Sequence, residues 1–244
     1  MAASLSYSVE CTFVQYEKVL ATLYQMWDFP RHEDIHIMTI HIFGGGTVQH
    51  VRNHLALCAP AYGTTARKLA AELENLRPDN TVKLHLTKMA NPDSSMETNQ
   101  DVSRVLNGLL SNPDTRAIIF NVAMCDFSGQ IDGIESGKYA ERLKTRDASY
   151  VHMELAPTPK VLASIKIARP DVFVVGFKTT AGATEIGQLS AADRQIRETG
   201  VNLVFANDTV TRNNMLVDGK GYRLRGSREE VLEMLALTLH GLLA

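Results

Sequence analysis

Apolar segments of strand length alternate with segments of helix length along most of this 244-residue chain. The expected strands are apolar almost throughout, which is typical of a parallel sheet that helices cover on both faces. The sequence therefore predicts an α/β fold with a Rossmann-like parallel sheet. The expected strands are Thr39–Phe43, Val82–Thr87, Ala117–Val122, Val172–Phe177 and Val201–Ala206.

The expected helices carry apolar residues at helical spacing or recognisable end signals. Ser190 is expected to cap a helix that stops at Gly200, and Ser227 to cap the last helix, with Glu230 three residues on. Pro159 fits the first turn of another helix, where its missing N–H costs little. The expected helices are Thr64–Leu76, Asn99–Asn112, Thr158–Ala168, Ser190–Gly200 and Ser227–Leu243.

Three parts of the chain do not follow the alternation. The span Ser128–Leu155 holds a polar loop and then an expected strand, Val151–Leu155. The span Asp208–Leu224 reads as a hairpin with Asp-Gly and Lys-Gly pairs at its turn. Residues 1–37 are expected to be an extension, helical around Val14–Trp27 or partly disordered, or a segment added by a misplaced start site, before a single nucleotide-binding domain at 38–244.

Composition excludes several classes of protein. The formal charge of −2 argues against nucleic acid as a partner. The cysteines Cys11, Cys58 and Cys125 are odd in number and form no CxxC pair, so we expect reduced thiols, no metal site and a cytoplasmic protein. No apolar run approaches 18 residues and no secretory signal stands at the start, so no membrane association is expected.

Small and polar residues follow four of the expected strands, where parallel sheets bind their ligands. Gly44, Gly45, Gly46 and Thr47 follow the first strand. Glycines let a backbone approach a phosphate, but the run is neither GxGxxG nor a Walker A loop, so a tight turn is the alternative.

Later strand ends carry side chains with two interpretations each. Lys178 follows a buried strand and either faces a ligand or is a solvated loop lysine. Asn207 and Asp208 either contact a base or ribose, or cap a turn locally.

A basic cluster and a cluster of histidine and cysteine also have more than one interpretation. Arg142, Lys144 and Arg146 alternate, so on an extended segment they would project one way, either to grip a polyphosphate or to protect a sheet edge. His50, His54 and Cys58 could supply a nucleophile and base, but no acidic residue lies nearby in the sequence to orient a histidine.

Taken in order, these segments resemble a known family. The chain from Met38 to Leu243 is similar to phosphopantothenate–cysteine ligase, also called phosphopantothenoylcysteine synthetase, the synthetase part of the coenzyme A flavoprotein family. The matching segments are GGGTVQHVR, IIFNVAMCDF, LAPTPKVLASI, VVGFKTT and VNLVFANDTVTRNNMLV.

The resemblance implies a ligase of coenzyme A biosynthesis that activates 4′-phosphopantothenate with CTP or ATP and passes it to cysteine. Mg²⁺ would arrive on the triphosphate, and a small strand or hairpin flap would form a homodimer. It implies catalytic roles for Arg142, Lys144 and Asp126. Nucleotide binding is expected at Gly44, Gly45, Gly46, Thr47, Ala123, Phe177, Lys178, Asn207 and Asp208.

One departure concerns the acid substrate. The family's asparagine position, central to acyl-nucleotide chemistry, falls on Ala56, and its Ser-Ser-Gly turn falls on Cys58-Ala59-Pro60. Arg52 and Asn53 complete the expected acid-binding segment. A nucleotide-binding homologue without ligase chemistry is therefore the alternative function. A Rossmann-type oxidoreductase is a third, disfavoured by the missing GxGxxG.

Overall fold

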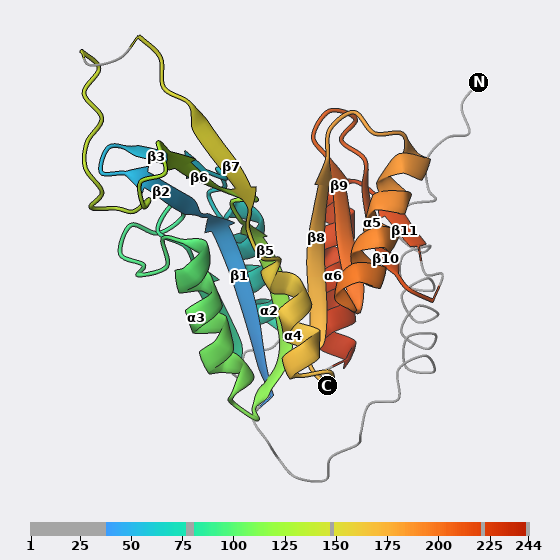
Figure 1. The fold of residues 1–244 in the computed structure, drawn as a ribbon. Coiled ribbons are helices and arrows are strands. Elements are labelled where there is room, and N and C mark those ends of the chain that lie inside the picture. Colours follow the sequence, from blue (N-terminus) through green and yellow to red (C-terminus); the bar gives the residue numbers. More distant parts are fainter. Residues whose placement is uncertain (1–37, 77–80, 147–148, 221–222, 243–244) are drawn as a thin grey trace.

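The computed structural model describes residues 38–76, 81–146, 149–220 and 223–242, and its centre is a seven-stranded sheet (Figure 1). The order across the sheet is β11-β10-β9-β8-β5-β1-β4. Strand β10 runs antiparallel to both of its neighbours, β9 and β11, and the other neighbouring pairs are parallel. The strands are β1 Thr39–Gly46, β4 Val82–Leu86, β5 Thr115–Ala123, β8 Phe173–Thr180, β9 Leu203–Asp208, β10 Asn214–Asp218 and β11 Arg223–Gly226.

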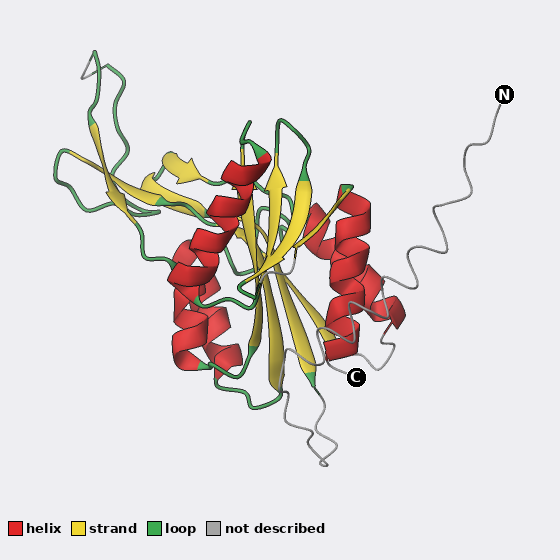
Figure 2. Ribbon diagram, turned by 90° about the vertical axis from the view of Figure 1, so that its right-hand side faces the viewer, coloured by secondary structure: helices red, strands yellow, loops and turns green. Residues whose placement is uncertain are grey.

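Helices cover both faces of this sheet, as the sequence predicts (Figure 2). On one face, α2 (Thr64–Leu76) and α6 (Arg228–Leu242) pack against alternate residues of the central strands. On the other face lie α3 (Asn99–Leu110), α4 (Val161–Ala168) and α5 (Glu185–Thr199). None of these described helices is long and apolar enough to cross a bilayer.

Two small antiparallel ribbons lie beyond the carboxyl ends of the central strands (Figure 1). One pairs β2 (Val48–Arg52) with β3 (Leu55–Cys58), and the other pairs β6 (Phe127–Ile131) with β7 (Met153–Pro157). The long loop between β6 and β7 projects away from the body, at the upper left of Figure 1. These ribbons form the small strand flap that the sequence predicts, although the β2–β3 hairpin itself was not expected.

Several end signals are confirmed. Ser227 and Glu230 form a reciprocal cap, with the Ser227 hydroxyl accepting from the Glu230 N–H and the Glu230 carboxylate accepting from the Ser227 N–H. Gly200 ends α5 in the left-handed conformation, with φ of 70°. The predicted hairpin is present as β10–β11.

Other boundaries were wrong. The helix α5 begins at Glu185, where Thr184 accepts from the Gly187 N–H, so Ser190 lies inside the helix rather than at its cap. The helix α4 begins at Val161, which leaves Pro159 in the preceding loop. The strand expected at Val151–Leu155 is β7, displaced toward the C-terminus. The expected extension at 1–37 lies outside the described residues.

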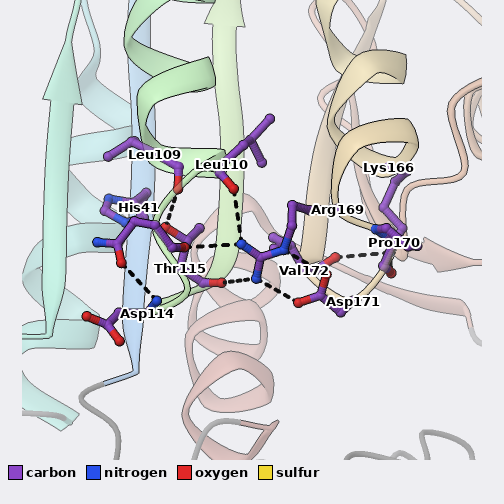
Figure 3. A network of polar contacts seen from close by, with 11 residues as sticks. His41, Leu109, Leu110, Asp114, Thr115, Lys166, Arg169, Pro170, Asp171 and Val172 are labelled. Atoms are coloured by element: carbon purple, nitrogen blue, oxygen red, sulfur yellow. Dashed lines mark hydrogen bonds and ion pairs between the residues drawn. The ribbon is translucent and has the colours of Figure 1, made fainter.

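Arg169 ties three elements together at the amino ends of the strands (Figure 3). Its guanidinium donates to the carbonyl oxygens of Leu110 and Asn112, at 3.1 Å each, and of Thr115 at 3.3 Å. Asp171 accepts two further bonds from it, at 2.7 and 2.8 Å. The arginine thus provides donors for carbonyls at and after the end of α3, which the helix itself cannot satisfy.

Two neighbouring histidines, the buried His41 and the half-buried His85, lie near the same end of the sheet. His41 Nδ1 is 3.0 Å from His85 Nε2, and the Thr115 hydroxyl is 3.3 Å from His41 Nε2. Burial, with a smaller contribution from His85 and Lys83, lowers the pKa of His41 from 6.5 to about 4. Burial also lowers the pKa of His85. Both rings are therefore neutral at pH 7.

Candidate functional site

A cavity of about 780 Å³ lies at the carboxyl ends of β1, β5, β8 and β9. Strand β1 has β4 on one side and β5 on the other, so the chain reverses direction across the sheet at this point. Open α/β sheets bind ligands at such a reversal. Of the residues that the sequence assigns to a site, seven line the cavity: Gly45, Ala59, Ala123, Asp126, Phe177, Lys178 and Asn207.

The glycine run is neither a strand-to-helix turn nor a complete cradle. All three glycines belong to β1, and only Gly45 lines the cavity. A β-carbon on Gly44 would lie 2.4 Å from the Ala66 side chain, and one on Gly46 would lie 2.0 Å from the Ala59 carbonyl oxygen. The glycines therefore let α2 and the loop before it pack closely against the end of β1. This packing helps to set the shape of the cavity.

Thr47 is buried beside the cavity and does not line it. Its hydroxyl donates to Asn99 Oδ1 at 2.6 Å and accepts from the Cys125 N–H at 2.9 Å. The Asn99 amide donates in turn to the Cys125 carbonyl at 2.8 Å, and the Thr158 hydroxyl donates to the same carbonyl at 2.6 Å. This network holds the turn after β5 that forms one wall of the cavity.

The carboxyl-terminal half of β8 supplies an aromatic wall and a cation. Phe177 lines the cavity and stacks on the buried Phe205, with 5.0 Å between the ring centroids. The side chain of Lys178, the next residue, has no hydrogen bond or ion pair with any described residue. Asn207 lies across from this strand and accepts from the Thr179 hydroxyl at 3.1 Å. These positions agree with the sequence prediction that strand ends gather here.

Asp208 organises two loops instead of facing the cavity. Its carboxylate accepts from the backbone of Gly182 and Ala183, at 3.0 and 2.9 Å, and from the backbone of Val210 and Thr211, at 2.9 and 2.8 Å. Burial by itself would raise the pKa of this carboxyl. The backbone donors and the Thr180 hydroxyl outweigh it and hold the pKa well below its usual range.

At the opposite wall, Asp126 forms an ion pair with Lys160, and both side chains are largely exposed. Both residues line the cavity. Because each charge has its counter-ion, this pair leaves little net charge at that wall. The neighbouring loop at 59–62 adds Pro60 and the exposed ring of Tyr62.

Three cations that line the cavity were not predicted from the sequence: Lys160, Arg194 on α5 and Arg228 at the start of α6. The side chain of Arg194 is exposed and forms no ion pair with a described residue. Arg228 follows the Ser227 cap directly, so its place on the first helical turn could have been read from the sequence. Which faces of the helices line the cavity could not be predicted from the sequence.

The predicted acid-binding residues are mostly elsewhere. Asn53, Ala56 and Cys58 are exposed on the β2–β3 hairpin and do not line the cavity. Arg52 is buried in the same hairpin and donates to the Val51 and Ile131 carbonyls at 2.8 and 2.7 Å. Within the predicted segment, only Ala59 and Pro60 line the cavity.

Arg142 and Lys144 lie in the loop between β6 and β7, outside the cavity. Residues 141–146 form loop and turn, so the extended segment considered for these side chains is absent. Both side chains are exposed.

The fold supplies the acidic residue that the sequence around His50 lacks. Glu97 Oε1 lies 3.3 Å from His50 Nε2, and its other oxygen accepts from Lys138 at 2.5 Å. The hydrogen bond from Lys138 lowers the pKa of Glu97. These residues line a second, smaller cavity of about 340 Å³, and Cys58 is not part of it.

The chain was compared with known proteins. No protein-family model matches it. Over 112 residues it is 30% identical to the coenzyme A biosynthesis bifunctional protein CoaBC of Thermococcus kodakarensis, an alignment that covers 46% of this chain and 26% of that protein. The chain thus spans about a quarter of the length of the curated relative that it matches.

Solved structures agree with this match. The DNA/pantothenate metabolism flavoprotein of Streptococcus pneumoniae superposes with a TM-score of 0.68 at 19% identity, covering 84% of this chain and 99% of that one. The resemblance inferred from the sequence motifs is confirmed.

Two further structures share the fold. The C-terminal domain of CoaBC gives a TM-score of 0.57 at 17% identity, covering 85% of this chain and 98% of that one. A Cab2 mutant in complex with phosphopantothenate-cysteine gives 0.53 at 13% identity, covering 97% and 94%. At these identities the structural matches establish the architecture alone.

Proposed function

We propose that this protein is a nucleotide-dependent ligase of coenzyme A biosynthesis, which joins a carboxylic acid to an amine such as that of cysteine. The observation that carries the proposal is the cavity at the strand ends, where Lys178, Arg194 and Arg228 meet the aromatic wall of Phe177. Cations and a stacking ring on one ligand-sized cavity suit a nucleoside triphosphate.

The proposed reaction has two steps. A carboxylate oxygen of the acid attacks the α-phosphorus of CTP or ATP, and the bond to the departing pyrophosphate breaks. The amine nitrogen then attacks the acyl carbon and loses a proton to solvent, and the nucleoside monophosphate leaves. Negative charge builds on phosphate oxygens in the first step, so fixed cations lower its barrier.

Mg²⁺ would arrive with the triphosphate. The described residues contain no group of three or more His, Cys, Asp or Glu side chains that could hold a metal ion. A metal ion carried by the phosphates needs no such cluster, and would supply neutralisation of the phosphate charge. Asp126 and Glu198 are the carboxylates that line the cavity, and Asp126 is paired with Lys160.

The second candidate is a nucleotide-binding homologue without ligase activity or with a different acid. The wall at 59–62 favours it, because Pro60 and Tyr62 stand there and the family's asparagine position, Ala56, lies on the hairpin outside the cavity. Arg142 and Lys144 would then act only if their loop moved over the cavity.

The experiment that separates the two uses the purified protein with 4′-phosphopantothenate, cysteine, Mg²⁺ and either CTP or ATP, and measures pyrophosphate. Release with one nucleotide supports the ligase. Nucleotide binding by calorimetry without release from either nucleotide would sink the ligase and leave the second candidate.

Lys178→Ala tests the phosphate contact directly. Because loss of a charge-assisted bond costs ~1.5–3 kcal/mol, affinity for the triphosphate should fall by about 10- to 100-fold. Arg104→Ala is the control, since that arginine lies on the exposed side of α3 and pairs with Asp101. An unchanged dissociation constant removes Lys178 from the site.

We also propose that the protein forms a homodimer through the flap. The β6–β7 ribbon and the loop between its strands carry exposed apolar side chains that a partner could cover: Phe127, Ile134, Tyr139, Tyr150, Val151 and Leu155. Light scattering at micromolar concentration is the measurement, and a monomer there contradicts it.

A further inference from the structure

Arg228 stands in the cavity without a carboxylate. Its Nη2 atom donates to the Thr65 hydroxyl at 2.6 Å, and the guanidinium lies over the Phe205 ring, 5.6 Å from the centroid. No ion pair joins Arg228 to any of the residues that the structure describes. A guanidinium has five N–H donors, so most of its donors have no protein acceptor in the described part of the chain.

The surroundings of Arg228 favour an anionic ligand. The side chain is partly buried, and burial lowers its pKa, as expected for a cation that has lost water without gaining a counter-ion. The charged neighbours are Glu229, which raises the pKa, and Arg212, which lowers it further. Glu229 itself is turned to Lys68, 3.4 Å away.

The contacts also fix where Arg228 points. Thr65, on the first turn of α2, lines the same cavity, as do Phe177 and Lys178. Phe205 stacks against Phe177, so a single buried ring supports both the aromatic wall and the guanidinium. Arg228 is therefore held by one hydrogen bond and one ring while its fork of donors remains available.

We propose that Arg228 binds a phosphate group of the ligand in this cavity, through hydrogen bonds from its guanidinium. The inference rests on the proposed function and adds a phosphate-binding residue to it. A planar guanidinium presents two parallel N–H donors in a fixed fork that matches two phosphate oxygens, whereas a lysine ammonium lacks this fixed geometry. The phosphate belongs either to the nucleotide or to the phosphorylated acid, and the experiment distinguishes these sources.

Calorimetry on the full chain tests the assignment with two pairs of ligands. The pairs are CTP and cytidine (ATP and adenosine, if the wild type prefers ATP), and 4′-phosphopantothenate and pantothenate. The variants are Arg228→Gln, which keeps a stem and a neutral donor, and Arg228→Lys, which keeps the charge. Arg225→Gln is the matched control, because Arg225 pairs with Glu185 on the surface, at 2.5 Å, and does not line the cavity.

We expect Arg228→Gln to weaken one phosphorylated ligand by about 10- to 100-fold and to leave its unphosphorylated counterpart within twofold. Arg228→Lys should recover only part of the loss, and the pair that responds identifies the source of the phosphate. Equal affinities of wild type and Arg228→Gln for both phosphorylated ligands overturn the inference but not the proposed function. Equal loss for a phosphorylated ligand and its counterpart also overturns it, because the residue would then support the fold. A wild-type protein that binds no nucleotide overturns the proposed function first.

Discussion

Gly46 lies against the carbonyl oxygen of Ala59 so closely that a β-carbon on the glycine would sit 2.0 Å from that oxygen. The Ala59 N–H donates to the Thr47 carbonyl at 3.0 Å, which keeps the two segments in this register. The contact explains why a glycine stands at the end of β1, and it makes the glycine run a device for close packing.

Gly46→Ala should therefore destabilise the protein by ~1–3 kcal/mol, because the backbone of the loop has to move. Melting temperature measured by calorimetry should fall by about 2–4 °C for each kcal/mol. Gly108→Ala is the control, since nothing lies within 4 Å of the added β-carbon and alanine favours the helix. A Gly46→Ala protein that melts with the wild type contradicts the packing role.

Adjacent residues on β9 should respond differently. Asp208→Ala removes the acceptor for both loops after β8 and β9, so the melting temperature should fall clearly. Asn207→Ala should leave it within about 2 °C but weaken nucleotide affinity by about 2- to 10-fold, through loss of a hydrogen bond. Calorimetric melting and binding measure the two effects, and the reverse pattern would show that the assignments are exchanged.

The histidine pair makes stability depend on pH. Because folding lowers the pKa of His41 from 6.5 to about 4, the unfolded chain binds more protons in that window. Stability is complete above pH 6.5 and is lost as the pH falls toward 4. His41 alone should cost about 2 kcal/mol between pH 7.5 and 5.

Urea unfolding at a series of pH values measures this loss. His41→Asn should flatten the dependence between pH 7.5 and 5, whereas His54→Asn, at an exposed position, should preserve it. Equal slopes in wild type and His41→Asn would assign the pH dependence to other groups.

Arg169→Ala should cost about 2–3 kcal/mol, because three backbone carbonyls lose a charged donor (Figure 3). Nucleotide affinity should not change, since the network lies at the end of the sheet opposite the cavity. Arg104→Ala, on an exposed side chain, should stay within ~0.5 kcal/mol of the wild type. Weaker nucleotide binding in folded Arg169→Ala would show that the two ends of the sheet are coupled.

The parallel sheet was predictable because its strands are buried on both faces and are apolar throughout. The β2–β3 hairpin was not predicted, because β2 mixes polar and apolar residues and β3 is a run of only four residues that alternate between half-buried and exposed. The start of α5 was misplaced for a related reason. Thr184 caps this helix within a run of small residues that gives little helical pattern. Ser190 was predicted as the cap because a clearer helical pattern follows it.

The candidate site was likewise predictable only in part. The positions of Lys178 and Asn207 could be predicted because the carboxyl ends of parallel strands all lie at one edge of the sheet. A local cap was one of the two interpretations of Asp208, and its bonds from the Val210 and Thr211 N–H groups confirm it. The contacts of Asp208 with residues 180–183 and of Arg228 with Thr65 join segments far apart in sequence, so no local pattern predicts them.

Residues 59–63, which form one wall of the cavity, contribute no side chain to either hydrophobic core. Their position is set by backbone contacts with Gly46 and by the hairpin and helix on either side. Under the proposed function, the side chains at 59–62 can therefore change the shape of the cavity with little effect on the two cores. Gly63 is the fixed point of the stretch, because its φ of +72° and its approach to Ala90 leave no room for a β-carbon.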